Sequence, residues 1–495
     1  MLWTVILIPA VAGALAMAAP YNRLRRCLLI AGALGHALVV GRLCVAGAGD
    51  VRLDSWIGLD AAGKLFLCVT SGLFLAVAVY TAGYLRREFG HTTRDTEEGF
   101  LFRNEPEAIF IGCLLFFLAT MSLVCVSRHM GLLWVAVEAT TLASAPLISF
   151  HRHHRSLEAT WKYLLICSVG IALALLGNFF LAYAGRGHIT HLSLHDLLAS
   201  AKALDPAWLK AAFLMLLVGY GTKMGLAPMH TWLPDAHSEA PSMVSALLSG
   251  ALLNCAFLGI LRSHTILSAA GLGHFSGELL VLFGLLSMGV AAVFLIHQSD
   301  YKRMLAYSSV EHMGILALGV GLGGLAATGA MLHAINHSLA KGMLFLTAGN
   351  LLAWYHTKQV DGVRGALTSR PVAGCLWLAG FLAIVGSPPF GLFVSELTIL
   401  RGALESGRWC VAAGYLLALG VIFVAMARLV LPMAFGRAEE RLAPKDDTTA
   451  SHNEAAWAVV PPLALGGAVL VLGVYVPPGL WEFLQSVAVG IGGQP

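Results

Sequence analysis

Residues 223–246 read KMGLAPMHTWLPDAHSEAPSMVSA, and this stretch decides how the chain is expected to fold. It places Lys223 inside an apolar run, interrupts that run at Pro228, and returns to apolar sequence after Pro241. Proline removes a backbone donor and clashes with the preceding helical turn, so a helix that reaches Pro228 is expected to break there. A charge at membrane depth costs several kcal/mol, so Lys223 is expected to face a protein-lined or hydrated interior. The alternative, a lysine that snorkels to the interface, fits poorly because Lys223 lies about fourteen residues into its span.

The composition places the chain among polytopic membrane proteins. Apolar residues make up 58% of the 495 positions and charged residues 12%, which excludes an ordinary soluble globular protein. The first apolar run, 2–19, has no basic residue before it and no small-residue cleavage site before Tyr21, so we expect no cleavable signal peptide. The net charge of +4 gives no reason to expect a nucleic-acid partner.

The cysteines and histidines predict no cofactor and no bound metal. The nine cysteines are scattered through or beside apolar runs without a CxxC spacing, so we interpret them as small core residues rather than metal or iron–sulfur ligands. The tract 151–155, HRHHR, suggests a metal site at first sight, but a short inner loop accounts for its arginines. No phosphate loop, dinucleotide fingerprint or nucleophile motif occurs in a credible context. The chain is therefore predicted to carry no redox centre of its own, and its part in any enzyme depends on partner subunits.

Apolar runs of about twenty residues predict an all-α polytopic membrane protein with about 14 transmembrane helices. The expected spans are 2–19, 27–46, 60–83, 107–127, 130–149, 158–184, 207–231, 240–262, 275–297, 303–322, 326–353, 371–402, 409–434 and 455–476.

Orientation follows from the basic residues in the loops. With the N-terminus outside, the inner loops hold more lysine and arginine than the outer ones, and they include Arg23, Arg86, Arg152, Lys302 and Arg437. An even number of spans then places both termini outside. In a bacterium this predicts the inner (cytoplasmic) membrane with both termini in the periplasm.

A second broken helix predicts an internal repeat. Span twelve is interrupted at 386–391, GSPPFG, and resumes with Glu396. Two proline-broken helices five spans apart fit two five-helix repeats, spans four to eight and nine to thirteen, and an odd number of spans makes the second repeat inverted. Broken helices at matching places in inverted repeats indicate an ion path at the repeat interface. Two unrelated proline kinks remain the alternative. The expected units are 1–106, 107–262, 263–434 and 435–495.

Several ionisable residues are expected at membrane depth. Glu138 is the only charged residue in span five, and Lys223 is its natural partner because opposite charges relieve each other's desolvation. This pair is interpreted as a switchable proton site, with a purely structural ion pair as the alternative. His333, His337 and Lys341 are spaced four residues apart and share one helix face, and histidine suits a proton relay.

Glu396 is expected to continue the same row into span twelve, as its last proton-translocating member. The remaining polar residues are ranked below this row. Asn254 is a polar residue in span eight, which has no lysine, and His230, Asp235 and His237 are possible connecting residues. Glu311 and His312 are expected to lie near the membrane interface. Four further residues stay ambiguous: Asp60, Lys64, Glu158 and Lys162.

Three stretches, 223–246, 299–309 and 333–346, resemble the antiporter-like family. That family comprises the large membrane subunits of respiratory complex I, of group 4 membrane-bound hydrogenases and of Mrp-type sodium/proton antiporters. Residues 132–178 and 308–314 are most similar to the hydrogenase-4 component F group within it.

The resemblance implies roles for individual residues. Glu138 and Lys223 match the family's glutamate–lysine pair, and Glu396 matches the terminal charged residue of span twelve. The central connecting residues are matched by His333, His337 and Lys341. Asn254 stands where several complex I relatives carry a connecting lysine, which implies that water or His333 bridges this position.

The resemblance also implies a function and its alternatives. We expect a proton-translocating membrane subunit of a hydrogenase-4 or formate-hydrogenlyase-type complex, with the redox chemistry in partner subunits. The first alternative is a subunit of complex I or of a related complex without hydrogenase activity. The second is a secondary Mrp-type cation/proton antiporter. The implied partners are other membrane subunits and, through them, hydrophilic redox subunits, together with the lipid bilayer and protons or sodium ions.

Overall fold

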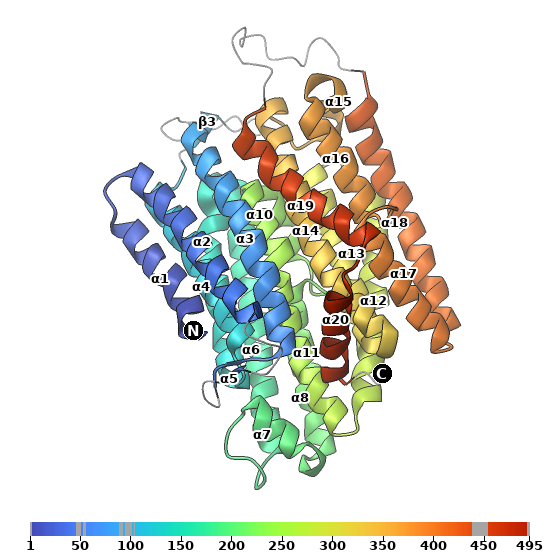
Figure 1. Cartoon of the computed structure of the whole chain (residues 1–495). Coiled ribbons are helices and arrows are strands. Elements are labelled where there is room, and N and C mark those ends of the chain that lie inside the picture. Colours follow the sequence, from blue (N-terminus) through green and yellow to red (C-terminus); the bar gives the residue numbers. More distant parts are fainter. Residues whose placement is uncertain are drawn as a thin grey trace.

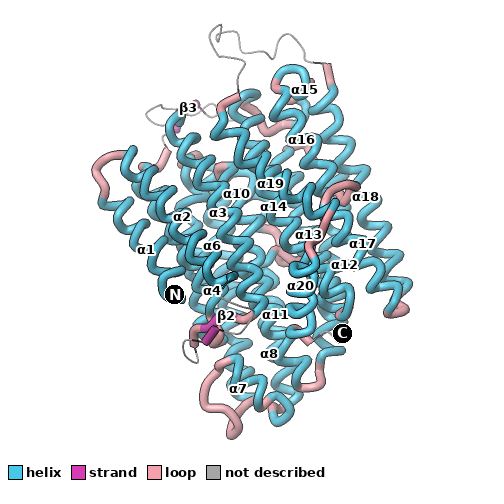
Figure 2. Tube along the Cα trace, in the orientation of Figure 1, coloured by secondary structure: helices cyan, strands magenta, loops and turns pink. Residues whose placement is uncertain are grey.

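The computed structural model describes residues 2–45, 51–52, 56–88, 93–94, 101–102, 104–437 and 454–492, and helices dominate these residues (Figures 1 and 2). Three further basic residues of the predicted inner loops, Arg103, Arg441 and Lys445, lie outside the described residues. The first half of the chain forms α1 (Leu2–Ala18), α2 (Asn22–Val45), α3 (Ala61–Glu88), α4 (Glu107–Val126), α5 (Met130–Ile148), α6 (His154–Ala184), α7 (Leu194–Ala199), α8 (Pro206–Met224), α9 (Trp232–Glu239), α10 (Ser242–Leu247) and α11 (Leu253–Ala269). The second half forms α12 (Gly273–Ile296), α13 (Tyr301–Leu322), α14 (Gly324–Tyr355), α15 (Ala366–Ser369), α16 (Pro371–Ile384), α17 (Gly391–Glu405), α18 (Trp409–Phe435), α19 (Ala456–Val474) and α20 (Pro478–Gly490).

Short elements connect the helices. The described strands form two antiparallel pairs, β1 (Val51–Arg52) with β2 (Gly58–Leu59) and β3 (Thr93–Arg94) with β4 (Leu101–Phe102). Single turns of 3-10 helix occur at η1 (Ser149–His151), η2 (Ala201–Ala203) and η4 (Val360–Gly362).

The predicted class, an all-α polytopic membrane protein, is confirmed. Ten helical stretches among the described residues are long and apolar enough to cross a membrane. The other four expected spans correspond to α1, α8, α14, and the pair α16 and α17. Large apolar side chains are exposed along α1, α2, α5, α6, α12 and α18, as expected for surfaces that face lipid or neighbouring subunits. The total of about 14 spans stays a prediction.

Both expected helix breaks are present. Helix α8 ends at Met224, Gly225 adopts a left-handed conformation with φ 82°, and α9 begins only at Trp232. The Trp232 indole donates to the Thr222 carbonyl at 2.8 Å, so it satisfies one acceptor that the break leaves in the last turn of α8. The second break separates α16 from α17, and Gly386 within it has φ 65°. A Cβ at Gly386 would collide with the Glu396 carboxylate, so glycine lets the broken segment lie against this side chain.

A third irregular helix lies in span eight, which was predicted as one continuous helix. Residues Leu248–Leu252 (η3) form a π-helix between α10 and α11. The Asn254 amide donates to the Gly250 carbonyl at 3.0 Å and to the Ser338 hydroxyl of α14 at 2.8 Å. A π-bulge widens one turn of a helix and often marks a functional position. Here it brings Asn254 against the central helix α14.

Helix α14 lies at the centre of the bundle and contacts α10, α13, α16, α17, α19 and α20. Figure 1 shows α1 and α2 at one edge, α18 at the other, and α19 running obliquely across the bundle. Both termini lie toward the same end of the molecule, opposite α15 and β3 (Figure 1). The inverted repeat, the four units and the periplasmic location of the termini stay predictions.

Candidate functional site

The lysine that precedes the first helix break is enclosed by hydroxyl groups. Lys223 is fully buried at the end of α8. Its ammonium donates to the Thr141 hydroxyl of α5 at 2.8 Å and to the Tyr163 hydroxyl of α6 at 2.5 Å. It also lies 4.3 Å from the centre of the Tyr163 ring, and Ser144 forms a 2.6 Å hydrogen bond with the same phenol. Hydroxyl oxygens and a π face therefore take the place of water around this ammonium.

Glu138 meets this ammonium through an intermediate hydroxyl. Thr141 donates to one oxygen of Glu138 at 3.2 Å, and Ser168 donates to the other at 3.0 Å. No direct ion pair joins Glu138 to Lys223 in the described part of the chain. A hydroxyl can accept one hydrogen bond while it donates another, so Thr141 links the ammonium to the carboxylate. The sequence predicted the two charged residues as members of the site but did not predict Thr141 or Tyr163.

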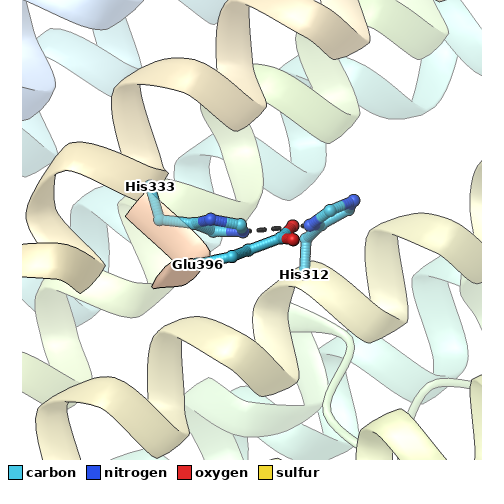
Figure 3. A group of neighbouring side chains, drawn as sticks. All are labelled: His312, His333 and Glu396. Atoms are coloured by element: carbon cyan, nitrogen blue, oxygen red, sulfur yellow. Dashed lines mark hydrogen bonds between the residues drawn. The ribbon is translucent and has the colours of Figure 1, made fainter. Parts of the chain in front are cut away.

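A second group of buried ionisable residues lies on α13, α14 and α17. His312 Nδ1 and His333 Nε2 are 2.9 Å apart, and His333 Nδ1 is 3.0 Å from the Ser395 hydroxyl. Figure 3 shows the Glu396 carboxylate extending toward both imidazole rings. We refer to His312, His333 and Glu396 together as the histidine–carboxylate cluster. All three residues are buried.

The hydrogen bonds of Ser395 assign the tautomers in this cluster. Ser395 donates to the Leu392 carbonyl at 2.9 Å, so its oxygen accepts from the N–H at Nδ1 of His333. For two neutral rings, Nε2 of His333 then accepts from the N–H at Nδ1 of His312. In this tautomer Nε2 of His312 carries the lone pair; no hydrogen bond of good geometry reaches it among the described residues, and the Ile384 carbonyl lies near the ring. A proton can therefore be added at His312 without breaking the contact between the rings.

Unpartnered polar atoms surround the cluster. Among the described residues, no hydrogen-bond partner is found for Oε1 of Glu396, Oε2 of Glu311 or either ring nitrogen of His337. The ring centre of His337 lies 5.1 Å from that of His312. Buried polar atoms normally carry partners, and those that protein groups leave open are the ones that bind water or exchange protons.

The expectation that Glu311 and His312 lie near the interface is wrong. Glu311 is 2% exposed and His312 is 0% exposed. Helix α13 begins at Tyr301, so Glu311 lies about 15 Å along it at about 1.5 Å per residue, close to the middle of the span. The sequence signal that would have placed these two residues correctly is their distance from the start of the helix.

The central connecting residues lie beside the cluster. Lys341 donates to the Leu305 carbonyl of α13 at 2.6 Å and interacts electrostatically with Glu311. His337 interacts electrostatically with both Lys341 and His237. These contacts join α9, α13 and α14, so they extend the cluster toward the first helix break.

Aromatic side chains, which we call the aromatic step, separate the Lys223 site from the histidine–carboxylate cluster. His237 packs against Phe345 with ring centres 5.6 Å apart and against Trp232 at 6.3 Å. The Trp232 ring in turn lies 5.0 Å from that of Tyr163, which binds Lys223. Trp232 therefore stands between the Lys223 site and the connecting residues. We call the whole series the polar row, with the members Glu138, Thr141, Tyr163, Lys223, His237, Lys341, His337, Glu311, His312, His333 and Glu396.

Two of the possible connecting residues lie away from the polar row. Asp235 accepts from Lys162 at 2.9 Å and pairs with Arg303, at the mouth of a polar cavity of about 360 Å³. The His230 ring packs edge-on against the stacked pair Phe294 and Tyr307, with both ring centres 6.2 Å away. Asn254 donates to the Ser338 hydroxyl of α14, and its hydrogen bonds reach no ionisable side chain among the described residues.

The three residues of the histidine–carboxylate cluster carry donor atoms of the kind that bind metal ions. One nitrogen or oxygen atom from each of His312, His333 and Glu396 lies within 4.8 Å of the others. The histidine tract behaves differently, because His151 bonds Asn104 at 3.0 Å and His153 accepts from the Ser156 amide at 3.1 Å to cap α6. The absence of a bound metal or cofactor stays a prediction.

Comparison with known proteins identifies the family. A family model described as "NADH:quinone oxidoreductase/Mrp antiporter, TM" matches residues 127–422. The chain belongs to this family. The matched segment contains both helix breaks and every member of the polar row.

Individual members of the NADH:quinone oxidoreductase/Mrp antiporter family cover most of the chain. A hydrogenase-4 component F homolog from Methylacidiphilum infernorum (isolate V4) is 34% identical over 445 residues, which are 88% of each chain. Subunit N of the NADH-quinone oxidoreductase of Desulforudis audaxviator (strain MP104C) is 31% identical over 427 residues, covering 84% of this chain and 80% of the relative. A chain of respiratory complex I from Thermus thermophilus superposes with a TM-score of 0.81 at 25% identity and covers both chains fully.

These similarities confirm the resemblance drawn from the sequence. The protein is an antiporter-like membrane subunit of the hydrogenase, complex I and Mrp family, embedded in the membrane by multiple spans. Its structural relatives are chains of multisubunit membrane complexes, which supports other membrane subunits as partners.

Proposed function

We propose that this chain translocates protons as a membrane subunit of a hydrogenase-4 or formate-hydrogenlyase-type complex. The redox reaction would take place in partner subunits and would drive or be driven by proton movement here. The observation that carries the proposal is the polar row, which connects Glu138 with Glu396 through the middle of the bundle. Idle ionisable groups at this depth are costly, so a series of them through the bundle indicates an ion path.

The first part of the path is a switch at Lys223. With Thr141 and Tyr163 as acceptors, the site holds a charged lysine, and the Thr141 link couples it to Glu138. A neutral Lys223 would keep two N–H donors for the two hydroxyls but would lose its electrostatic attraction to Glu138. A negative charge on Glu138 therefore favours the protonated form of Lys223. Neutralisation of Glu138 favours release of the lysine proton toward His237, past Trp232.

The second part of the path is the histidine–carboxylate cluster. Protons would pass by Lys341 and His337 to the open nitrogen of His312 and on to Glu396. Histidine is suited to this role because its ordinary pKa lies near neutrality. Glu396 is the last member of the row, and the glycine at position 386 leaves room for its carboxylate at the second helix break.

The hydrogenase-4 assignment is supported by the relative that matches 88% of each chain at 34% identity. A second candidate is a subunit of a complex I-type assembly, which the 31% identity to a subunit N supports. Purification of the native complex distinguishes them. A nickel–iron large subunit among the co-purifying proteins would support the first, and NADH-oxidising subunits would support the second. Purification of the chain without any redox subunit would instead favour a secondary cation/proton antiporter.

We also propose that the protein lies in a bacterial inner membrane with both termini in the periplasm. The basic residues of the loops support this orientation. Reporter fusions after Arg152 and after Arg262 should report opposite sides of the membrane, with Arg152 inside. The same side for both loops would contradict the proposed topology.

The direct test is proton uptake by proteoliposomes that contain the assembled complex, driven by its own redox reaction. The proposal requires uptake that a protonophore abolishes and that Lys223→Ala removes while electron transfer and assembly persist. Uptake that survives this substitution would exclude a path through Lys223. A requirement for sodium ions in the same vesicles would assign sodium as the transported ion instead.

A further inference from the structure

Two cysteine sulfurs near one end of the bundle are close enough to react. Cys44 is the penultimate residue of α2 and Cys68 lies on α3, and their sulfur atoms are 3.0 Å apart. A disulfide bond is about 2.0 Å long, so an approach of about 1 Å would close it. Cys44 is exposed and Cys68 is partly exposed, so a reagent can reach the pair.

The position of this pair indicates the compartment it meets. The Lys64 ammonium donates to the Cys44 carbonyl at 3.2 Å, and a lysine head group keeps to the aqueous boundary of a membrane. The end of α2 and the beginning of α3 lie at the same end of the bundle as the N-terminus (Figure 1). On the proposed topology this end faces the periplasm, where disulfides form and persist.

We propose that Cys44 and Cys68 form a structural disulfide in the cell. The inference rests on the proposed orientation of the chain, and it is independent of the proton path. The two thiols would lose two protons and two electrons as the S–S bond forms. An envelope dithiol–disulfide oxidoreductase would supply the oxidant: its own disulfide is attacked by one cysteine, a mixed disulfide forms, and the second cysteine resolves it to leave the oxidant as a dithiol.

The disulfide would lie where α2, α3 and α11 meet. Asp60 directly precedes α3, accepts from the Gly63 amide at 2.7 Å, and pairs with Arg262 of α11 at 3.4 Å. A cross-link between the end of α2 and the first turns of α3 restricts the connection between them in the unfolded chain, which stabilises the folded state. Reduction should therefore loosen the meeting point of these helices rather than the polar row.

The chain supplies its own control pair. Cys125 of α4 and Cys255 of α11 also form a thiol–thiol contact, but they are 0% and 1% exposed. A protein oxidant cannot reach them in the folded bundle. Proximity alone would oxidise both pairs, whereas proximity combined with access to the periplasm oxidises only Cys44 and Cys68.

The experiment is thiol trapping in intact cells followed by mass spectrometry of the full-length subunit from the native complex. Cells are quenched in acid, free thiols are alkylated under denaturing conditions, and the protein is digested without reductant. We expect a linked Cys44–Cys68 peptide as the main form, with Cys125 and Cys255 alkylated. Cys44→Ser and Cys68→Ser should each remove the linked peptide and leave the other cysteine alkylated.

Alkylated Cys44 and Cys68 in most of the wild-type protein would overturn the proposal. If copper–phenanthroline then linked the pair in the purified complex, the geometry would stand but the disulfide in the cell would still be refuted. The double variant Cys44→Ser/Cys68→Ser should retain proton uptake in proteoliposomes. Loss of the disulfide and loss of translocation are therefore separate outcomes, and a failure of one proposal is not mistaken for a failure of the other.

Discussion

The Lys223 site and the histidine–carboxylate cluster both lie beside a broken helix, yet their polar atoms are satisfied in different ways. The Lys223 ammonium is bound by two hydroxyls and a ring face. In the cluster, one nitrogen of His312 and one oxygen of Glu396 lack a hydrogen-bond partner among the described residues. The first site is organised to hold a charge, and the second has open positions that can accept a proton.

The difference follows from the chemistry of the neighbouring side chains. Thr141 and Tyr163 provide oxygens that can accept from an ammonium whatever the position of their own hydrogens. An imidazole offers only one lone pair when it is neutral, and His333 uses that pair to accept from His312. We therefore expect substitutions at the first site to act on charge storage and those at the second to act on proton transfer.

The largest expected effect is at Lys223. Both Lys223→Ala and Lys223→Arg should reduce proton uptake to the level of empty vesicles, because alanine removes the charge and arginine keeps it permanently. The measurement is redox-driven uptake by proteoliposomes that hold equal amounts of assembled complex. Lys210→Arg, on the exposed beginning of the same helix, is the matched control and should retain uptake. Full activity in Lys223→Arg would show that deprotonation of this lysine is not a step in the path.

Glu396→Gln should have the next largest effect, a fall in uptake of about tenfold or more. The amide fits the same space but cannot take up a proton, and general acid–base groups typically contribute factors of about 100 or more to a proton-transfer step. Glu405→Gln on the same helix α17 is the control, because Glu405 is exposed and its one ion pair within the described part of the chain is with Arg401 at 2.7 Å. Equal rates in the two variants would remove Glu396 from the path and confine the proposal to the first site.

A moderate effect is expected from Thr141→Val, which keeps the shape of the side chain and removes the hydroxyl between Glu138 and Lys223. A hydrogen bond to a charged group contributes about 1.5–3 kcal/mol, and Tyr163 remains as a second acceptor, so uptake should fall several-fold rather than vanish. Thr140→Val is the control, since among the described residues its hydroxyl bonds only the Val137 carbonyl of its own helix. If Thr141→Val pumped at the wild-type rate, the hydroxyl link would have no part in coupling the two charges.

The smallest effect is expected from Trp232→Phe. The ring contacts with Tyr163 and His237 would be retained in part, but the hydrogen bond to the Thr222 carbonyl would be lost. The loss should cost about 1 kcal/mol of stability and lower the melting temperature slightly, with a small decrease in uptake. Trp208→Phe at the partly exposed start of α8 serves as the control for general loss of an indole. A larger loss of uptake than in Glu396→Gln would mean that the indole itself takes part in transfer across the aromatic step.

Much of the architecture could be predicted from the sequence because its causes are local. The cost of proline in a helix depends on the preceding turn alone, so Pro228 and the 386–391 segment indicated both breaks without any knowledge of packing. The spacing of His333, His337 and Lys341 likewise predicts a shared face from helical periodicity. The same stretches were sufficient to indicate the family that the comparisons then confirmed.

The contacts that distinguish the two sites depend on residues far apart in the chain, and only the tertiary structure decides them. Lys223 and Thr141 are separated by 82 positions, and His333 and Ser395 by 62. No local rule relates such positions, because their distance depends on how α5, α6 and α8, or α13, α14 and α17, pack together. The sequence by itself determined which segments are helices, where two of them break and that Lys223, Lys341 and Glu396 are buried. Packing determined that a threonine hydroxyl lies between Glu138 and Lys223, and that His312 meets His333 in the middle of the bundle.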